Sequence, residues 1–186
     1  MKLIVPTPEV QIEFSASLRE VRQVMLQGAL SATMRVLNIS EIDRELAEFV
    51  SGHSLAMLAG FGLRGELVFP VPSVLKASPR LLGYYRLLYG YSQKEFYNVA
   101  TGLGRFKAME ENGIVRSGIA SEIPALSAAM CEAGAKLLAG IGPAKITPGF
   151  LDDLTLLTLG PQLRGGANVR KGAAGIRTVF VTAQVG

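Results

Sequence analysis

Apolar residues recur at helical spacing along most of the chain, and this pattern predicts a mainly α-helical protein. The first clear helix is headed by Ser40, and its apolar residues stand at i, i+4, i+7 and i+8: Ile42, Leu46, Phe49 and Val50. We expect it to end at Gly52 or to continue through Leu58. A preceding helix is predicted over residues 15–27, where apolar residues again share one side.

The centre of the chain carries the clearest helix start and stop signals. Ser78 followed by Pro79 is typical of an N-cap and a first helical position, and Gly90 closes the apolar stripe that follows. Ser92 and Glu95 then form the pattern of a capping box. Tyr91 precedes the cap and Phe96 is the fourth helical residue, which are the two positions that a hydrophobic staple brings into contact. We therefore expect two helices joined by a tight corner.

Three more helices are predicted after this corner, over residues 104–112, 123–140 and 147–160. The last one begins at Thr147-Pro148 and is expected to end at Gly160-Pro161. Residues 65–71 are the best strand candidate, restricted to a sheet edge by Pro70, and residues 176–185 fit either a strand or a helix.

The predicted fold class is thus an irregular multi-helix domain with at most a short strand or hairpin. A single domain over residues 1–186 is expected from the chain length. The alternative is a division into a helical core over residues 1–120 and a helical, basic segment over 121–186.

Composition narrows the class of protein further. The chain is 49% hydrophobic and 18% charged, which is too apolar for a disordered protein. Its single cysteine, Cys131, permits no intramolecular disulfide and is expected to be a buried structural thiol. The N-terminal segment is not expected to be a signal peptide, because Pro6 breaks it early, and no uncharged apolar stretch reaches the roughly 20 residues that a membrane helix needs. We expect a soluble cytoplasmic protein without a membrane partner.

The net positive charge of the chain comes from its C-terminal end. All 15 acidic residues precede residue 160, whereas four of the 19 basic residues follow it: Arg164, Arg170, Lys171 and Arg177. Glycines among them would let a phosphate approach main-chain N–H groups, and the cations would neutralise it. This pattern indicates a polyanionic partner, above all nucleic acid, or else a solvated basic tail that binds nothing in particular.

The usual catalytic patterns are absent from the sequence. His53 and Cys131 cannot form a zinc cluster between them, and no Gly-x-Ser-x-Gly elbow supports a serine nucleophile. No lysine has an acidic residue two positions earlier, so the acid-x-Lys pattern of metal-dependent restriction nucleases is missing. Asp152 and Asp153 are better explained as helix-start residues than as metal ligands.

Three segments resemble the N-terminal half of XcyI-type type II restriction endonucleases: GELVFPV (65–71), PRLLGYYRLLYGYSQKEFY (79–97) and FLDDLTLLTLGPQLRGGAN (150–168). The resemblance implies the N-terminal half of a larger α/β nuclease that cleaves double-stranded DNA at a short GC-rich palindrome. It also implies magnesium as cofactor and a homodimer. The catalytic carboxylates and lysine would lie downstream of the matched region, so we expect this chain to be inactive alone. It would then be a fragment, a truncated product, or the partner of a separate catalytic chain.

The residues expected to contact DNA are Arg164, Asn168, Arg170 and Lys171, with Gln93 and Lys94 as secondary candidates at the start of the capped helix. Arginine reads guanine in the major groove and asparagine reads adenine, and either can hold phosphate instead. No catalytic or metal-binding residue is assigned. The alternative function is a non-enzymatic helical protein-interaction module, in which the apolar excess serves a partner protein.

Overall fold

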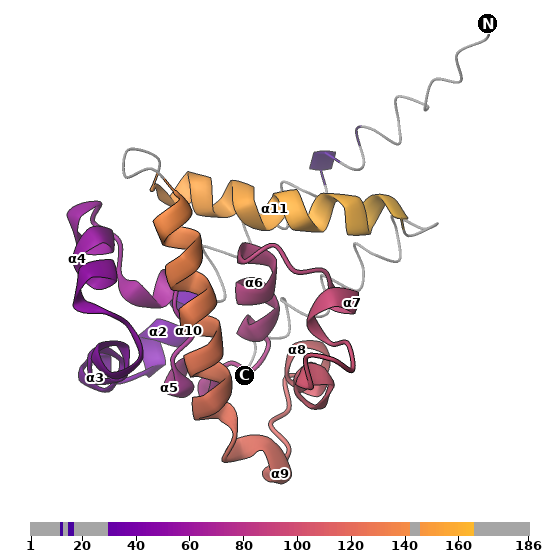
Figure 1. Ribbon diagram of the computed structural model, residues 1–186, viewed down its shortest axis with the longest axis horizontal. Helices are drawn as coiled ribbons and strands as arrows, with labels where there is room; N and C mark the ends of the chain where they lie inside the picture. Colours follow the sequence, from indigo (N-terminus) through magenta and orange to yellow (C-terminus); the bar gives the residue numbers. More distant parts are fainter. Residues whose placement is uncertain (1–11, 13–14, 17–29, 142–145, 166–186) are drawn as a thin grey trace, which may run out of the picture.

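A computed structural model describes residues 12, 15–16, 30–141 and 146–165, and these residues form a multi-helix domain (Figure 1). No strand is present among them, which confirms the mainly α fold class. The helical elements within the described ranges are α2 (Ser31–Val36), α3 (Ile39–Phe49), α4 (Gly52–Gly60), η2 (Gly65–Leu67), α5 (Pro72–Ala77), α6 (Leu81–Leu88), α7 (Gln93–Phe96), η3 (Leu103–Phe106), α8 (Lys107–Asn112), α9 (Ser117–Ala120), α10 (Ile123–Gly140) and α11 (Pro148–Gly165).

Helix α6 lies near the centre of the domain (Figure 1). Helix α11 packs along α6, whereas α10 packs against α5 and α3. Helix α8 contacts α6 on the side opposite α3 and α4 (Figure 1). Every residue of α6 is buried, as its nearly continuous apolar sequence requires. No helix within the described ranges has the length and apolar character needed to span a bilayer.

Three tyrosines of α6 and its C-cap hold the segment that precedes α5. The hydroxyl of Tyr85 donates to the carbonyl of Glu66 at 2.6 Å, and that of Tyr84 donates to Leu67 at 2.7 Å. Tyr89 donates to the next carbonyl, that of Val68, at 2.6 Å. Burial raises the pKa of all three hydroxyls, so they remain donors at any physiological pH.

These bonds explain why the strand predicted over residues 65–71 is wrong. The segment begins as the 3₁₀ helix η2, and its carbonyls accept from tyrosine side chains where a strand would need a neighbouring strand. The apolar run of the segment still indicates burial correctly, because Val68 and Phe69 are fully buried. The pattern predicted the environment of the segment, and side-chain hydroxyls in another helix determined its conformation.

Helix ends differ from the predictions by a few residues at several places. The first clear helix is capped by Asn38, whose side-chain oxygen accepts from the N–H of Ser40 at 3.0 Å, so Ser40 lies inside it. That helix ends at Phe49, and Ser51 caps a separate helix α4. Ser78 and Pro79 form a turn before α6 instead of starting the helix themselves.

The predicted end of the last helix is also wrong, because α11 continues through residues 160 and 161 to Gly165. Proline lacks the N–H that would bond to the carbonyl of Leu157. Leu157 is 74% exposed, so water can satisfy that carbonyl, while Leu151 and Thr155 are buried in the core. The helix predicted over residues 15–27 lies mostly outside the described residues, and the segment 176–185 lies entirely outside them.

Candidate nucleic-acid interface

The basic C-terminal segment begins in the last turn of α11. Arg164 belongs to that turn by its backbone, and its side chain lies outside the described residues. Asn168, Arg170 and Lys171 also lie outside them. The basic segment therefore starts at the end of α11, a helix that packs on α6.

The second candidate, the start of α7, is described in full. Ser92 accepts from the N–H of Glu95 at 3.2 Å, and the Glu95 carboxylate accepts from the N–H of Ser92 at 2.8 Å. These bonds hold the pKa of Glu95 below its ordinary value. The rings of Tyr91 and Phe96 lie 5.9 Å apart. The capping box and the hydrophobic staple predicted from the sequence are both confirmed.

Gln93 and Lys94 have different surroundings on α7. The amide nitrogen of Gln93 donates to Glu110 at 3.0 Å, which ties the start of this helix to α8. Lys94 is exposed and forms no ion pair within the described part of the chain. Lys94 is therefore available to an anion, whereas Gln93 has a structural contact to maintain.

A buried ion pair anchors this corner of the domain. The Nε and Nη2 atoms of Arg86 donate to the two carboxylate oxygens of Glu110 at 2.9 and 2.8 Å, and the hydroxyl of Tyr97 donates to the same carboxylate at 2.6 Å. With Gln93, these residues form what we term the Arg86–Glu110 cluster. The side chains of Arg86 and Glu110 are 3% and 7% exposed. Such a pair is tolerated because every carboxylate oxygen has a donor.

The cluster also sets the charge of Glu110. Burial would raise the pKa of this carboxyl, but the hydrogen bonds and charge of Arg86, with those of Tyr97 and Gln93, hold the pKa below its ordinary value. A third guanidinium nitrogen of Arg86 donates to the carbonyl of Tyr91 at 2.5 Å. Arg86 thereby fixes the loop that leads into α7.

No motif in the sequence marks Arg86 and Glu110 as a pair. The available signal was Arg86 itself, a charged residue inside the otherwise apolar run from Leu81 to Leu88. An arginine at such a position is expected to be paired with a buried acid. The sequence offered no means of choosing Glu110 as the partner, since the two residues are 24 positions apart.

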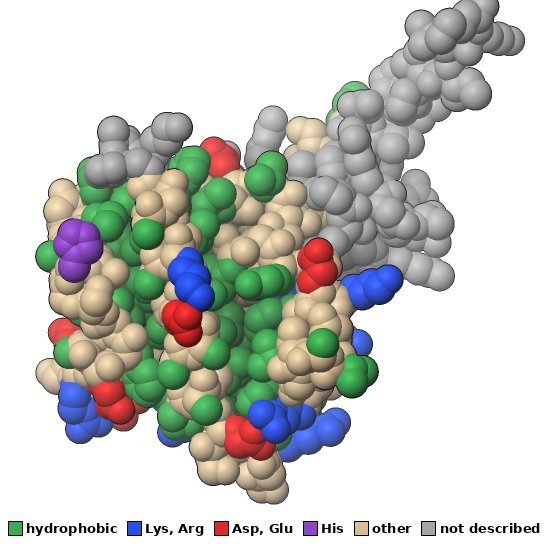
Figure 2. All heavy atoms as spheres, viewed as in Figure 1, with side chains coloured by type: hydrophobic (Ala, Val, Ile, Leu, Met, Phe, Trp, Pro, Cys, Tyr) green, Lys and Arg blue, Asp and Glu red, His purple; other side chains and the backbone are tan. Residues whose placement is uncertain are grey.

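Some other cations on the described surface pair with acids, whereas Arg35, Arg44, Lys76 and Arg116 are exposed and form no ion pair among the described residues. Arg64 pairs with Asp43 and Glu66, and the remaining pairs join exposed or half-exposed side chains: Arg105–Glu122, Lys107–Glu111 and Lys136–Glu132. Figure 2 shows blue and red side chains side by side on the visible face. Acidic and basic residues balance in number before residue 160, in contrast to the acid-free sequence after it.

The described ranges contain neither a metal-binding cluster nor a reactive thiol. No group of three or more His, Cys, Asp or Glu side chains there could hold a metal ion. Cys131 is buried, as predicted, and burial raises the pKa of its thiol to about 12. The thiol is therefore a core group and not a nucleophile.

Comparisons with known proteins match nearly the whole chain. The family model of the XcyI restriction endonuclease matches residues 15–184. The chain is 51% identical to the type II restriction enzyme XcyI of Xanthomonas campestris pv. cyanopsidis, and 50% identical to the type II restriction enzyme Cfr9I of Citrobacter freundii.

Each alignment covers 96% of this chain but only 54% and 55% of the relatives, so the chain spans about half the length of the curated relatives it matches. No solved structure matches it. Identity near 50% over almost the entire chain, together with the family match, confirms the resemblance seen in the sequence. The chain belongs to the XcyI restriction endonuclease family.

Proposed function

We propose that this chain is the DNA-engaging and dimerising part of a type II restriction endonuclease that acts on double-stranded DNA. Its relatives are type II restriction enzymes, and the chain corresponds to about half of each. The observation that carries the DNA-binding role is the distribution of charge. All excess cations follow residue 159, whereas the 15 basic and 15 acidic residues before it balance.

We assign the DNA contacts to Arg164, Asn168, Arg170 and Lys171, with Lys94 as an additional phosphate contact. Guanidinium groups can bind phosphate or read guanine bidentately, which suits a short GC-rich palindrome, and the amide of Asn168 can read a base edge. Gln93 is the weakest of the proposed contacts because its amide nitrogen already bonds to Glu110. A two-fold DNA target is matched by a homodimer.

Magnesium is the expected cofactor of the complete nuclease, since a magnesium ion held by carboxylates would activate water for phosphodiester hydrolysis. The described residues do not fit this ion, because no cluster of three acidic or metal-binding side chains occurs among them. We therefore assign no catalytic residue here. The metal-binding carboxylates would belong to a part of the nuclease outside the described ranges or to a separate catalytic chain.

The DNA-binding assignment can be tested with duplex DNA at about 50 and about 200 mM salt. The double variant Arg164→Ala/Arg170→Ala should bind more weakly and lose about two from the slope of log affinity against log salt. The matched control is Arg35→Ala/Arg44→Ala, which removes the same charge from exposed positions on α2 and α3. Equal losses in the two double variants would overturn the assignment.

An alternative function, a non-enzymatic helical protein-interaction module, is favoured by one observation. Helix α10 carries exposed alanines along its outer face, which is unusual for a surface that meets only water. Absence of any duplex binding by the wild-type chain at the lower salt concentration would favour this module over the DNA-binding part.

A further inference from the structure

Helix α10 has two apolar faces, and the described residues cover one of them. The inner face is buried through residues such as Met130, Gly134 and Leu138. The outer face is exposed, and its side chains other than one acid and one base are small or apolar: Pro124, Ala125, Ala128, Ala129 and Ala139. A helix that is apolar on all sides is normally buried by a further element. This outer face therefore has the composition of an interface.

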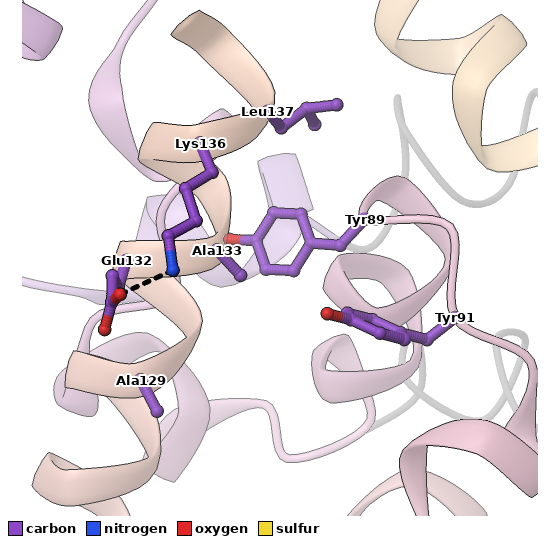
Figure 3. A pocket seen from close by; sticks show the side chains of 7 residues that line it. All are labelled: Tyr89, Tyr91, Ala129, Glu132, Ala133, Lys136 and Leu137. Carbon is purple, nitrogen blue, oxygen red and sulfur yellow. Dashed lines mark hydrogen bonds and ion pairs between the residues drawn. The ribbon is translucent and has the colours of Figure 1, made fainter. Parts of the chain in front are cut away.

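An open groove of about 470 Å³ runs beside the outer face (Figure 3). Tyr89 and Tyr91 line it on one side, and α10 lines it on the other with Ala129, Glu132, Ala133, Lys136 and Leu137. Figure 2 shows hydrophobic side chains gathered over this part of the molecule, around a single blue and red pair. Tyr91 is 42% exposed and its ring packs on that of Phe96, so it presents an aromatic side chain at the edge of the groove.

The charges on this face have a self-complementary order. Glu132 and Lys136 stand one turn apart, with their carboxylate and ammonium groups 2.6 Å apart, and their side chains are 70% and 75% exposed. If two such helices pack antiparallel about a two-fold axis, Glu132 of each faces Lys136 of the partner subunit. A parallel arrangement in register would instead place like charges opposite each other. The charge pattern thus favours one geometry, a symmetric pair of α10 helices.

The same register brings small residues together along the rest of the helix. Ala129 lies opposite Ala139 of the partner subunit, and Ala128 lies opposite Gly140 of the partner subunit. The distance between packed helices depends on the side chains at their contact, so alanine and glycine allow a close approach. In this register residues 128–140 of the two helices overlap, and at about 1.5 Å per residue they provide a seam of about 20 Å.

We propose that the outer face of α10, with the groove beside Tyr91, is the surface at which a second copy of this chain packs antiparallel about a two-fold axis. The proposal rests on the proposed function, which calls for a two-fold protein on a two-fold DNA target. It adds the location of the dimer contact. Glu132 and Lys136 determine its register, and Tyr91 is the aromatic anchor at its edge.

The test uses charge reversal and sedimentation of the full chain at low salt, where exposed charges are little screened. Glu132→Lys makes the pair wholly positive and Lys136→Glu makes it wholly negative, so each variant alone should self-associate at least about tenfold more weakly than the wild type. An equimolar mixture of the two should form heterodimers, because each lysine then faces a glutamate. The matched control is Glu111→Lys, which creates the same repulsion one turn apart from Lys107 on α8 and should leave assembly unchanged.

Recovery of association in the mixture, with monomeric single variants, would establish the interface, and a destabilised helix could not mimic it. Dimers that persist in both single variants would overturn the proposal, as would a wild-type chain that is monomeric at all concentrations. Duplex DNA binding by the wild type is measured in parallel. A chain that pairs in this way without binding DNA would refute the proposed DNA-binding role alone. DNA binding by a monomer would refute the interface alone.

Discussion

The guanidinium of Arg86 forms a two-pronged contact with the carboxylate of Glu110, through N–O distances of 2.8 and 2.9 Å. The two residues come from α6 and α8, and both side chains are less than a tenth exposed. A planar guanidinium matches the geometry of a carboxylate, so the pair specifies how these helices meet. Because Gln93 and Tyr97 bond to the same carboxylate, the contact also orients α7.

Removal of one partner of this ion pair should be strongly destabilising. Glu110→Ala leaves the buried guanidinium of Arg86 without a counter-charge, and such losses cost about 3–5 kcal/mol of the free energy of unfolding. Urea unfolding followed by circular dichroism measures the change. The control is Glu111→Ala, whose exposed side chain pairs only with Lys107, so its effect should remain within about 0.5 kcal/mol. Unfolding midpoints that agree for the two variants would show that the cluster is not an anchor.

The same carboxyl should make the fold sensitive to acid. The pKa of Glu110 is lower in the folded protein than its ordinary value of 4.5, so the unfolded state binds a proton first as the pH falls. Its contribution to stability is present above about pH 4.5 and is lost as the pH falls through the folded pKa. Urea midpoints between about pH 6 and pH 3 should decline more steeply for the wild type than for Glu110→Gln, which cannot titrate. Parallel declines would contradict the depressed pKa.

Local signals in the sequence predicted the local structure of this region well. The capping box of Ser92 and Glu95 depends on atoms three residues apart, and the structure contains both of its hydrogen bonds. The start of α10 at Ile123 likewise follows from the proline next to it. Interactions of this kind are encoded within one or two helical turns, so a single sequence is enough to recognise them.

Interactions between distant residues could not be predicted in the same way. The apolar run in residues 65–71 indicated a strand, but three tyrosine hydroxyls about 20 positions later donate hydrogen bonds to the carbonyls of that segment. The pairing of Arg86 with Glu110 depends on how α6 meets α8, which no local pattern encodes. For the residues that we propose as DNA contacts, the sequence supplied the charge distribution, and only Gln93 and Lys94 have described surroundings.

Loss of one of these tyrosine hydroxyls should have a measurable cost. Tyr85→Phe removes the donor to the carbonyl of Glu66 in a fully buried site, and an unsatisfied buried carbonyl costs about 1–3 kcal/mol. The control is Tyr91→Phe, because Tyr91 is partly exposed and its hydroxyl has no hydrogen-bond partner among the described residues. Its unfolding free energy should change by less than about 0.5 kcal/mol. If Tyr85→Phe were equally silent, hydroxyl bonding would not explain the conformation of residues 65–71.

Close packing of α10 on the core should make Gly134 intolerant of a side chain. A Cβ atom there would lie 2.9 Å from the hydroxyl of Tyr89 and 3.1 Å from the ring of Phe69. Gly134→Ala should therefore destabilise the protein by about 1–3 kcal/mol, although alanine is the better helix former. Gly60→Ala is the control, since no atom lies within 4 Å of its added Cβ. A gain in thermal stability at Gly134 would show that Tyr89 and Phe69 can move aside.

Lys94 offers a test of whether the body of the domain takes part in DNA binding. The Arg86–Glu110 cluster and the capping box hold α7 in place, and Lys94 is exposed on it without an ion pair in the described ranges. If its ammonium contacts a phosphate, Lys94→Ala should reduce the slope of log affinity against log salt by about one, for every duplex sequence. Lys76→Ala is the control, because Lys76 is equally exposed on α5. A general loss of positive charge affects both variants alike, so equal slopes would show no specific phosphate contact at Lys94. The DNA contacts would then be restricted to the segment that follows residue 159.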